Sequence, residues 1–296
     1  MEELEGEAIW EWCEVHGYRD ILDEHSYRSL IFALLSDLCQ FVYEGLKCSE
    51  KGKLAVAFSN FRKPIQDNLY FLEWILADWP DFLARFRQGP EQIDTSKLRE
   101  LRKAIRLDII ARAMDKTAIG RWVDPDWLYE LRYEKASDFG LDRTFNHALH
   151  LVTTHKHYAT SAENLNFVFC NDEDRQDLWE RLYLLLPTIL LHTLHVVRAL
   201  FKSFAPDFEA RDGICDLWLS AGYLLWTESS CSEVAREGAA AIFNESLSED
   251  PLNCPKCGAK LQFENEDLQH FWDKGEIRCT KCKTVVPLVE PTHVDR

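Results

Sequence analysis

The stretch LAVAFSNFRKPIQDNLYFLEWIL, residues 54–76, decides the fold class of this chain. Its large apolar residues recur at steps of three and four positions: Leu54, Phe58, Phe61, Ile65, Leu69, Leu72 and Leu76. That spacing places them on one face of an amphipathic helix. Pro64 lies inside the run and has no backbone N–H to donate, so it predicts a kink or a new helix start at that point.

Comparable helical patterns extend in both directions from this stretch. They cover residues 26–42, 95–114, 142–154, 172–204 and 207–226. Capping residues such as Asp142 precede several of them, and Pro or Gly residues separate them. Alternation typical of a strand is scarce, and residues 164–169 are the main ambiguous segment. We therefore expect a mainly α protein, with a multi-helix, bundle-like domain over residues 1–247.

Composition and charge restrict the function classes. The chain has 296 residues, of which 46% are hydrophobic, and its 50 acidic and 34 basic side chains give a net charge of −16. Such a charge disfavours general affinity for a phosphate backbone. The longest apolar run, residues 182–201, contains Pro187 and Arg198, so we expect a buried core helix and no membrane span. The acidic start lacks an apolar signal core, which favours a cytoplasmic location.

The ten cysteines divide into two groups. Six are isolated, and four form the pairs Cys254-Pro-Lys-Cys257-Gly and Cys279-Thr-Lys-Cys282. Two thiolates three positions apart in a tight turn can bind one ion, and a second pair completes a tetrahedron. The flanking stretches are short and partly alternating, as small strands are. Because so short a segment has little core of its own, we expect residues 252–296 to form a β module that a metal stabilises.

This C-terminal segment resembles a zinc ribbon. The resemblance implies one structural Zn²⁺ with four thiolate ligands: Cys254, Cys257, Cys279 and Cys282. Lys283 departs from the pattern, since Gly is common at that position. Four protein ligands leave no open coordination position, so the ion would be structural and not catalytic. From Cys254 onward the segment has seven basic and seven acidic residues, which favours a stabilising or docking module over a nucleic-acid contact.

One segment runs against the acidic trend. Residues 97–121 contain eight basic and three acidic side chains. A helical wheel places four of the basic residues on one face: Arg99, Arg102, Lys103 and Arg106. The face could contact an anion or an RNA backbone. The commoner alternative is a solvated face that pairs with the acidic remainder of the chain.

Histidines are concentrated in two places. Four fall within eleven residues: His147, His150, His155 and His157. On a helix over residues 142–154, Arg143, His147 and His150 share one face. A second pair, His192 and His195, lies on the apolar helix. If the two faces met, their imidazoles could form a metal or acid–base site. Otherwise the first pair is solvated and the second consists of hydrogen-bonded core histidines.

An all-helical domain with Arg followed by His resembles the HEPN ribonucleases, whose motif separates these residues by four to six positions. Arg19 and His25 fit that spacing, as do Arg143 and His150. The resemblance implies a metal-independent ribonuclease that uses Arg143 and His150, with His147 nearby. Gly-rich phosphate loops and the common hydrolase and zinc-protease motifs are absent from the sequence, so those classes lose support.

Two functional hypotheses follow. The first is a cytoplasmic helical binding or regulatory protein with a structural zinc ribbon. Its partner would be another protein or a second copy, because 10 Trp and 17 Phe residues suit an interface. The alternative is the HEPN-type ribonuclease.

Overall fold

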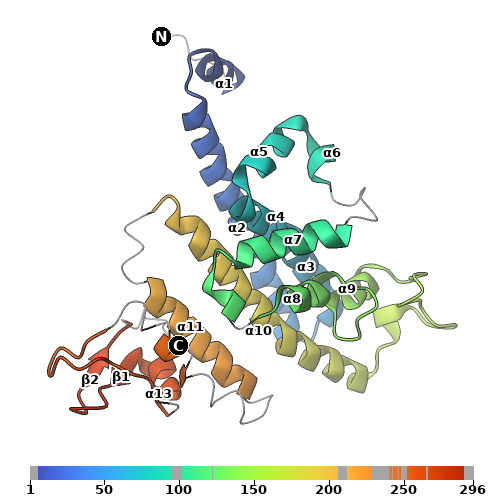
Figure 1. The fold of residues 1–296 in the computed structure, drawn as a ribbon. Helices are drawn as coiled ribbons and strands as arrows, with labels where there is room; N and C mark the ends of the chain where they lie inside the picture. The colour runs from blue at the N-terminus through green and yellow to red at the C-terminus, as the bar shows by residue number, and fades with distance from the viewer. Residues whose placement is uncertain are drawn as a thin grey trace. The chain divides into compact units, whose positions relative to one another are not determined.

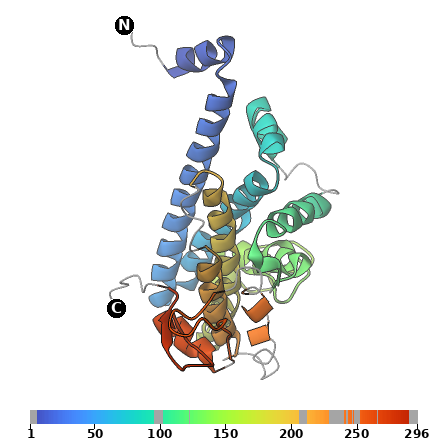
Figure 2. The same ribbon diagram turned by 60° about the vertical axis from the view of Figure 1, so that its left-hand side comes forward.

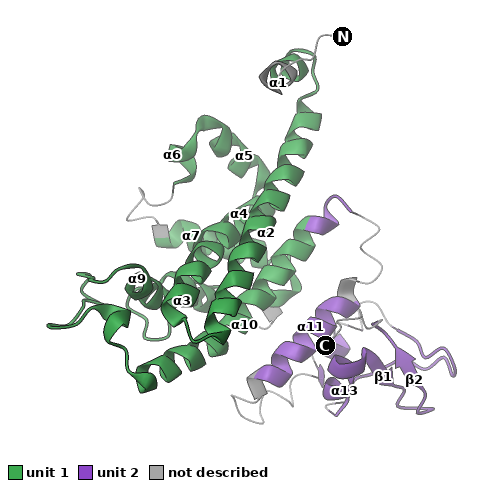
Figure 3. Cartoon of the chain, turned by 180° about the vertical axis from the view of Figure 1, so that it is seen from behind, with its two compact units in different colours: residues 1–200 green, residues 201–296 purple. Residues whose placement is uncertain are grey.

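The computed structural model describes residues 6–94, 102–121, 123–205, 212–228, 240–241, 243–245, 247, 252–264 and 266–289. The fold is mainly α, as the sequence predicted, with a small two-stranded sheet near the C-terminus (Figure 1). The chain divides into two compact units, Met1–Leu200 and Phe201–Arg296 (Figure 3). Each unit has its own core.

Unit 1 consists of helices. In chain order these are α1 (Gly6–Val15), α2 (Arg19–Glu50), α3 (Leu54–Lys63), the π-helix η1 (Pro64–Asn68), α4 (Leu69–Ala77), α5 (Trp79–Gln88), α6 (Pro90–Ile93), α7 (Arg102–Met114), η2 (Ala118–Arg121), α8 (Pro125–Tyr133), α9 (Leu141–Leu149), η3 (Asn166–Phe169) and α10 (Asp172–Lys202). The long helix α2 packs against α3, η1 and α4 (Figure 2). The other side of this central run contacts α7, α8 and α9.

The predicted apolar stripe forms the centre of unit 1. All of its members except Leu76 are buried. Helices α2 and α3 approach closely at Gly45, where a Cβ atom would lie 2.8 Å from the Phe61 ring. A larger residue at position 45 would therefore push the two helices apart.

Pro64 interrupts the helical run, as predicted, by starting the π-helix η1. The N–H of Leu69 bonds to the carbonyl of Pro64, five residues back, and not to that of Ile65, four residues back. The carbonyl of Ile65 instead accepts a hydrogen bond from Nε of Arg132 at 3.0 Å. The neighbouring carbonyl of Gln66 accepts one from the Tyr133 hydroxyl at 2.9 Å. The π-turn thus ties η1 to α8 through its own backbone.

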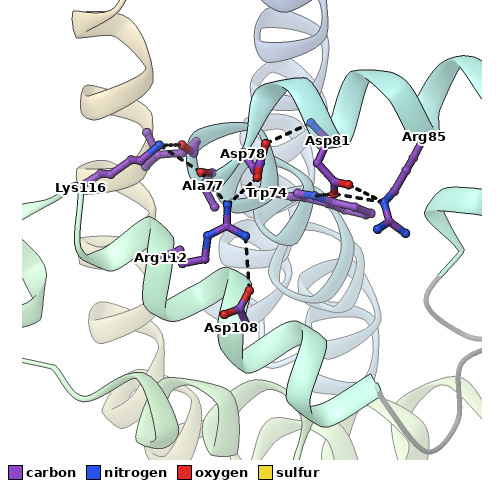
Figure 4. A network of polar contacts seen from close by, with 9 residues as sticks. Trp74, Ala77, Asp78, Asp81, Arg85, Asp108, Arg112 and Lys116 are labelled. Carbon is purple, nitrogen blue, oxygen red and sulfur yellow. Dashed lines mark hydrogen bonds and ion pairs between the residues drawn. The ribbon is translucent and has the colours of Figure 1, made fainter.

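The junction between α4 and α5 is held by α7 (Figure 4). Arg112 donates to Asp78 at 2.7 Å and to the carbonyl of Ala77 at 3.3 Å. Lys116 donates to the carbonyls of Leu76 and Ala77 at 2.8 and 3.1 Å. The last carbonyls of a helix lack partners within the helix, and cations interact favourably with that end. Two side chains of α7 therefore complete the C-terminus of α4.

One expectation in the middle of the chain was wrong in detail, and one ambiguous segment is resolved. The helix predicted over residues 142–154 ends as α9 at Leu149, because His150 takes an extended conformation with φ −124° and ψ 130°. Leu151 and Val152 are 62% and 58% exposed and do not extend an apolar stripe. The ambiguous segment 164–169 contains the short helix η3 and no strand.

Unit 2 contains α11 (Asp212–Glu228), α13 (Asp267–Lys274), β1 (Glu276–Arg278) and β2 (Val285–Pro287). The strands are antiparallel, with Ile277 opposite Val286. Helix α13, which the sequence did not predict, lies between the two cysteine pairs. Helix α11 packs on it: the Trp218 and Trp272 rings stack at 4.6 Å, and a Cβ atom at Gly222 would lie 2.4 Å from Trp272. Helix α11 therefore belongs to the same compact unit as the cysteine pairs, and this unit begins at Phe201. The sequence analysis had assigned residues up to 247 to the helical domain.

Candidate functional site

The two cysteine pairs of unit 2 are held by identical turns. In the first, the N–H of Gly258 donates to the carbonyl of Cys254 at 2.9 Å. In the second, the N–H of Lys283 donates to the carbonyl of Cys279, also at 2.9 Å. Each turn therefore presents its two sulfur atoms in the same way, and the two turns face each other.

The last residue of each turn takes a left-handed conformation. Gly258 has φ +67°, and Lys283 has φ +59°. An L-residue pays roughly 1–2 kcal/mol for that conformation, whereas glycine adopts it freely. The departure of Lys283 from the ribbon pattern is thus accommodated at the cost of backbone strain.

The four predicted ligands lie together. Sγ of Cys254 is 3.6 Å from Sγ of Cys282, and Sγ of Cys257 is 3.7 Å from Sγ of Cys279. All four sulfur atoms lie within 4.8 Å of one another. A tetrahedral zinc ion with Zn–S bonds near 2.3 Å needs sulfur separations of about 3.8 Å, and a disulfide needs about 2.05 Å. The geometry therefore fits one zinc-sized ion and no disulfide.

Hydrogen bonds at the second turn favour thiolates. The hydroxyl and N–H of Thr284 lower the pKa of Cys282 to about 6, and the Sγ–Oγ1 distance is 3.2 Å. The N–H of Cys282 lowers the pKa of Cys279. At Cys257 the N–H of Ala259 also favours the thiolate, but desolvation and the neighbouring thiols outweigh it and raise the pKa to about 11. Four clustered thiolates need a cation, which a bound metal would supply.

The histidines occupy several different environments. His192 is fully buried, and its Nε2 donates to Oε1 of Glu73 at 2.6 Å. His195 is also buried. Nε2 of His147 lies 2.8 Å from the carbonyl of Tyr158, and His150 is exposed beyond the end of α9. Within the described ranges, the cysteine cluster is the one group of His, Cys, Asp or Glu placed to share an ion.

The proposed nuclease residues are only partly associated. Arg143 and His147 line one cavity of about 600 Å³, together with Arg181, but His150 is not among its lining residues. The shared helical face expected for His150 does not form, because α9 ends before it. The other pair with the motif spacing, Arg19 and His25, lies exposed near the start of α2.

A buried ion pair was missed by the sequence analysis. Glu73 and Arg132 both have 0% exposure, and their side chains form an ion pair at 2.6 Å. Burial alone would raise the pKa of Glu73, but the Arg132 guanidinium and the hydrogen bond from His192 hold it below its usual range. The available signal was the presence of charged residues inside two largely apolar runs: one in FLEWIL and two in LYELRY, of which Arg132 is the buried one. Such positions are buried only with a partner.

Lys103 and Arg106 of α7 line a cavity of about 770 Å³. Lys103 pairs with Glu134 at 3.3 Å, and the Arg106 guanidinium stacks on the Tyr133 ring at 4.3 Å. Arg102 begins α7, and Arg99 lies outside the described residues. The described part of the predicted face is therefore engaged within unit 1.

No family model, no curated protein and no solved structure matches this chain. Helices α2 and α10 are long and apolar enough to cross a membrane by length and composition alone. The apolar window of α10 is 56% buried inside the protein, and that of α2 is 17% buried.

Proposed function

We propose that this chain is a helical binding protein in which one Zn²⁺, held by the four cysteines, folds unit 2 as a zinc ribbon. The observation that carries the proposal is the sulfur cluster, with contacts of 3.6 and 3.7 Å between turns of identical construction. Thiolates are ligands that favour zinc, and a site with four of them has no place for water or substrate. The ion would neutralise the thiolates and link the two turns.

Several features support binding over catalysis. The candidate catalytic residue His150 lies away from the cavity that Arg143 and His147 line. Large aromatic residues are exposed on α1 and at the start of α2, namely Trp10, Trp12 and Tyr18. Such residues are enriched at protein interfaces, so we infer another protein or a second copy as partner. The isolated free cysteines suit a reducing compartment, in keeping with a cytoplasmic location.

Elemental analysis of the full chain under reducing conditions tests the metal centre. One zinc per chain is expected, and Cys257→Ser should lose it because three thiolates bind zinc far more weakly. Cys39→Ser, which changes an exposed cysteine of α2, is the matched control and should retain the zinc. A zinc content below about 0.2 per wild-type chain would contradict the proposal.

The ribonuclease alternative has one observation in its favour, the shared cavity of Arg143 and His147. RNA incubated with the purified protein tests it. A binding protein leaves the RNA intact. Specific cleavage that disappears in Arg143→Ala and His147→Ala, but persists in the control Arg85→Gln, would establish a nuclease instead.

A further inference from the structure

A cavity of about 770 Å³ in unit 1 has the construction of a small-molecule site. Residues from α3, η1, α4, α6, α7, α8 and α9 line it, together with the loop after α9. Gln66 and Asp67 of the π-turn lie in its wall. π-Turns occur frequently at functional sites, and cavities of this size accommodate metabolites.

One wall of the cavity is rigid. Nε2 of Gln66 donates to the carbonyl of Arg132 at 2.8 Å and to Oδ1 of Asp142 at 2.9 Å. Asn146 donates to the other carboxylate oxygen of Asp142 at 3.1 Å. A wall whose side chains are already hydrogen-bonded needs little reordering when a ligand enters.

Several cations of the cavity lack a counter-ion. The described residues place no carboxylate within ion-pair distance of Arg62, Lys135 or Lys156, and Nε of Arg62 is buried without a hydrogen-bond partner. Asp142 and Glu134, in contrast, already have partners. Asp67 is an exposed residue of the cavity wall, and it forms no ion pair among the described residues. Desolvation raises its pKa, while the nearby cations, Arg62 foremost, oppose that shift.

A buried hydroxyl on the same wall lacks a partner. Tyr70 is 2% exposed, and its hydroxyl makes no hydrogen bond in the described structure. Leaving a buried donor unsatisfied costs roughly 1–3 kcal/mol, so native proteins rarely do so. An acceptor oxygen on a bound molecule would satisfy it.

Positive charge also gathers at the loop after α9. The His155 ring stacks on Tyr158 at 4.6 Å and lies 5.5 Å from the His157 ring. Desolvation lowers the pKa of His155, and so do the nearby charges of Lys135, His157 and Lys156. These influences disfavour the protonated imidazole, and an anion bound there would favour it again.

We propose that this cavity binds a small molecule that carries a phosphate group. The phosphate oxygens would accept hydrogen bonds from Arg62 and from Lys135 and Lys156, while the Tyr70 hydroxyl would donate to a further oxygen of the ligand. The net charge of −16 opposes a long polyanion, so a single phosphorylated metabolite fits better than RNA.

Isothermal titration of the full zinc-loaded chain tests the proposal, with ribose 5-phosphate and AMP as probes. Ribose and adenosine, which lack phosphate, should bind at least about tenfold more weakly. Arg62→Gln and the double variant Lys135→Gln/Lys156→Gln should each weaken binding of the phosphate probes about tenfold or more. Tyr70→Phe should weaken it less, because the ring remains. Arg85→Gln changes an exposed arginine paired with Asp81 outside the cavity and should bind like wild type.

Three results would overturn the inference. They are the absence of binding up to about 10 mM probe, equal binding of ribose and ribose 5-phosphate, and an unchanged affinity in folded Arg62→Gln protein. Binding of a ten-nucleotide RNA without binding of either small probe would also contradict it. Repeating the titration with Cys257→Ser separates this inference from the metal centre, since every lining residue belongs to unit 1.

Discussion

The two units of this chain bury charge in different ways. Unit 1 places the Glu73 carboxylate next to the Arg132 guanidinium at 2.6 Å, with both side chains fully buried. Unit 2 gathers four thiols, two of which have a lowered pKa, and supplies no cation among the described residues at their centre. In unit 1 the compensating charge is part of the chain. In unit 2 the proposed metal ion would supply it from solution.

This difference determines how far the stability of each unit depends on the solution around it. A buried pair within the chain is present whenever the chain folds, so the stability of unit 1 is set by sequence. A cluster of thiolates ties folding to the free concentration of its metal.

Metal removal should separate the units most strongly. In small zinc domains, structural zinc contributes roughly 10–16 kcal/mol to the apparent free energy of folding. Chelation should therefore unfold unit 2, including its helix α11. Hydrogen exchange should show loss of protection around Trp218 and Trp272, with protection retained around Ile110 in unit 1. Loss of protection in both units would show that they fold as one.

Breaking the buried ion pair should destabilise unit 1 and leave unit 2 folded. Arg132→Met leaves the Glu73 carboxylate buried without its cation, which costs about 3–5 kcal/mol. Denaturant unfolding should show the loss in unit 1, with the zinc content unchanged. Adding Glu73→Leu should recover part of the stability, because no unpaired ion stays buried, although His192 loses its acceptor. A double variant no more stable than Arg132→Met would contradict this account.

Acid should weaken the pair in a defined direction. The pKa of Glu73 is held below its ordinary value of 4.5, so the stabilisation is complete above about pH 4.5. It is lost as the pH falls through the lower folded pKa, because protonation leaves Arg132 without a counter-ion. The free energy of unfolding of unit 1 should therefore decrease in acid, and the decrease should be smaller in Glu73→Gln. Parallel pH profiles for the two proteins would exclude Glu73 as the cause.

The smallest effect concerns the two cysteine turns. Lys283 takes a left-handed φ of +59°, so Lys283→Gly should stabilise zinc-loaded unit 2 by about 0.5–1 kcal/mol. Lys281→Gly, in the same turn but without a positive φ, should give no gain and serves as control. Thermal melting with excess zinc measures both. A destabilised Lys283→Gly protein would mean that the lysine side chain contributes a contact.

Much of the fold was predictable from the sequence because its signals are local. The stripe from Leu54 to Leu72 follows from periodicity alone, and the sulfur cluster follows from two Cys-x-x-Cys spacings. The end of α9 was not predictable in this way. There, Thr153 and Thr160 exchange hydrogen bonds across a loop, which outweighs the helical pattern that continues through His150.

The remaining parts of the candidate sites depend on contacts between distant residues. Glu73 and Arg132 are 59 positions apart, and Glu73 and His192 are 119 apart. Periodicity within one helix carries no information about such partners. The cavity beside η1 likewise needs seven elements and two loops in place, so only some of its basic lining residues were singled out beforehand, namely Lys103, Arg106, His155 and His157.

The π-turn has a consequence for the ancestry of the chain. A turn of this kind holds one residue more than an α-helical turn, as a one-residue insertion into a helix would produce. Here the extra residue frees the Ile65 carbonyl that receives Arg132, which in turn neutralises Glu73. Losing the extra residue would leave Arg132 with one acceptor fewer. In descendants of a common ancestor, the length of this turn and the charges at positions 73 and 132 should therefore be gained and lost together.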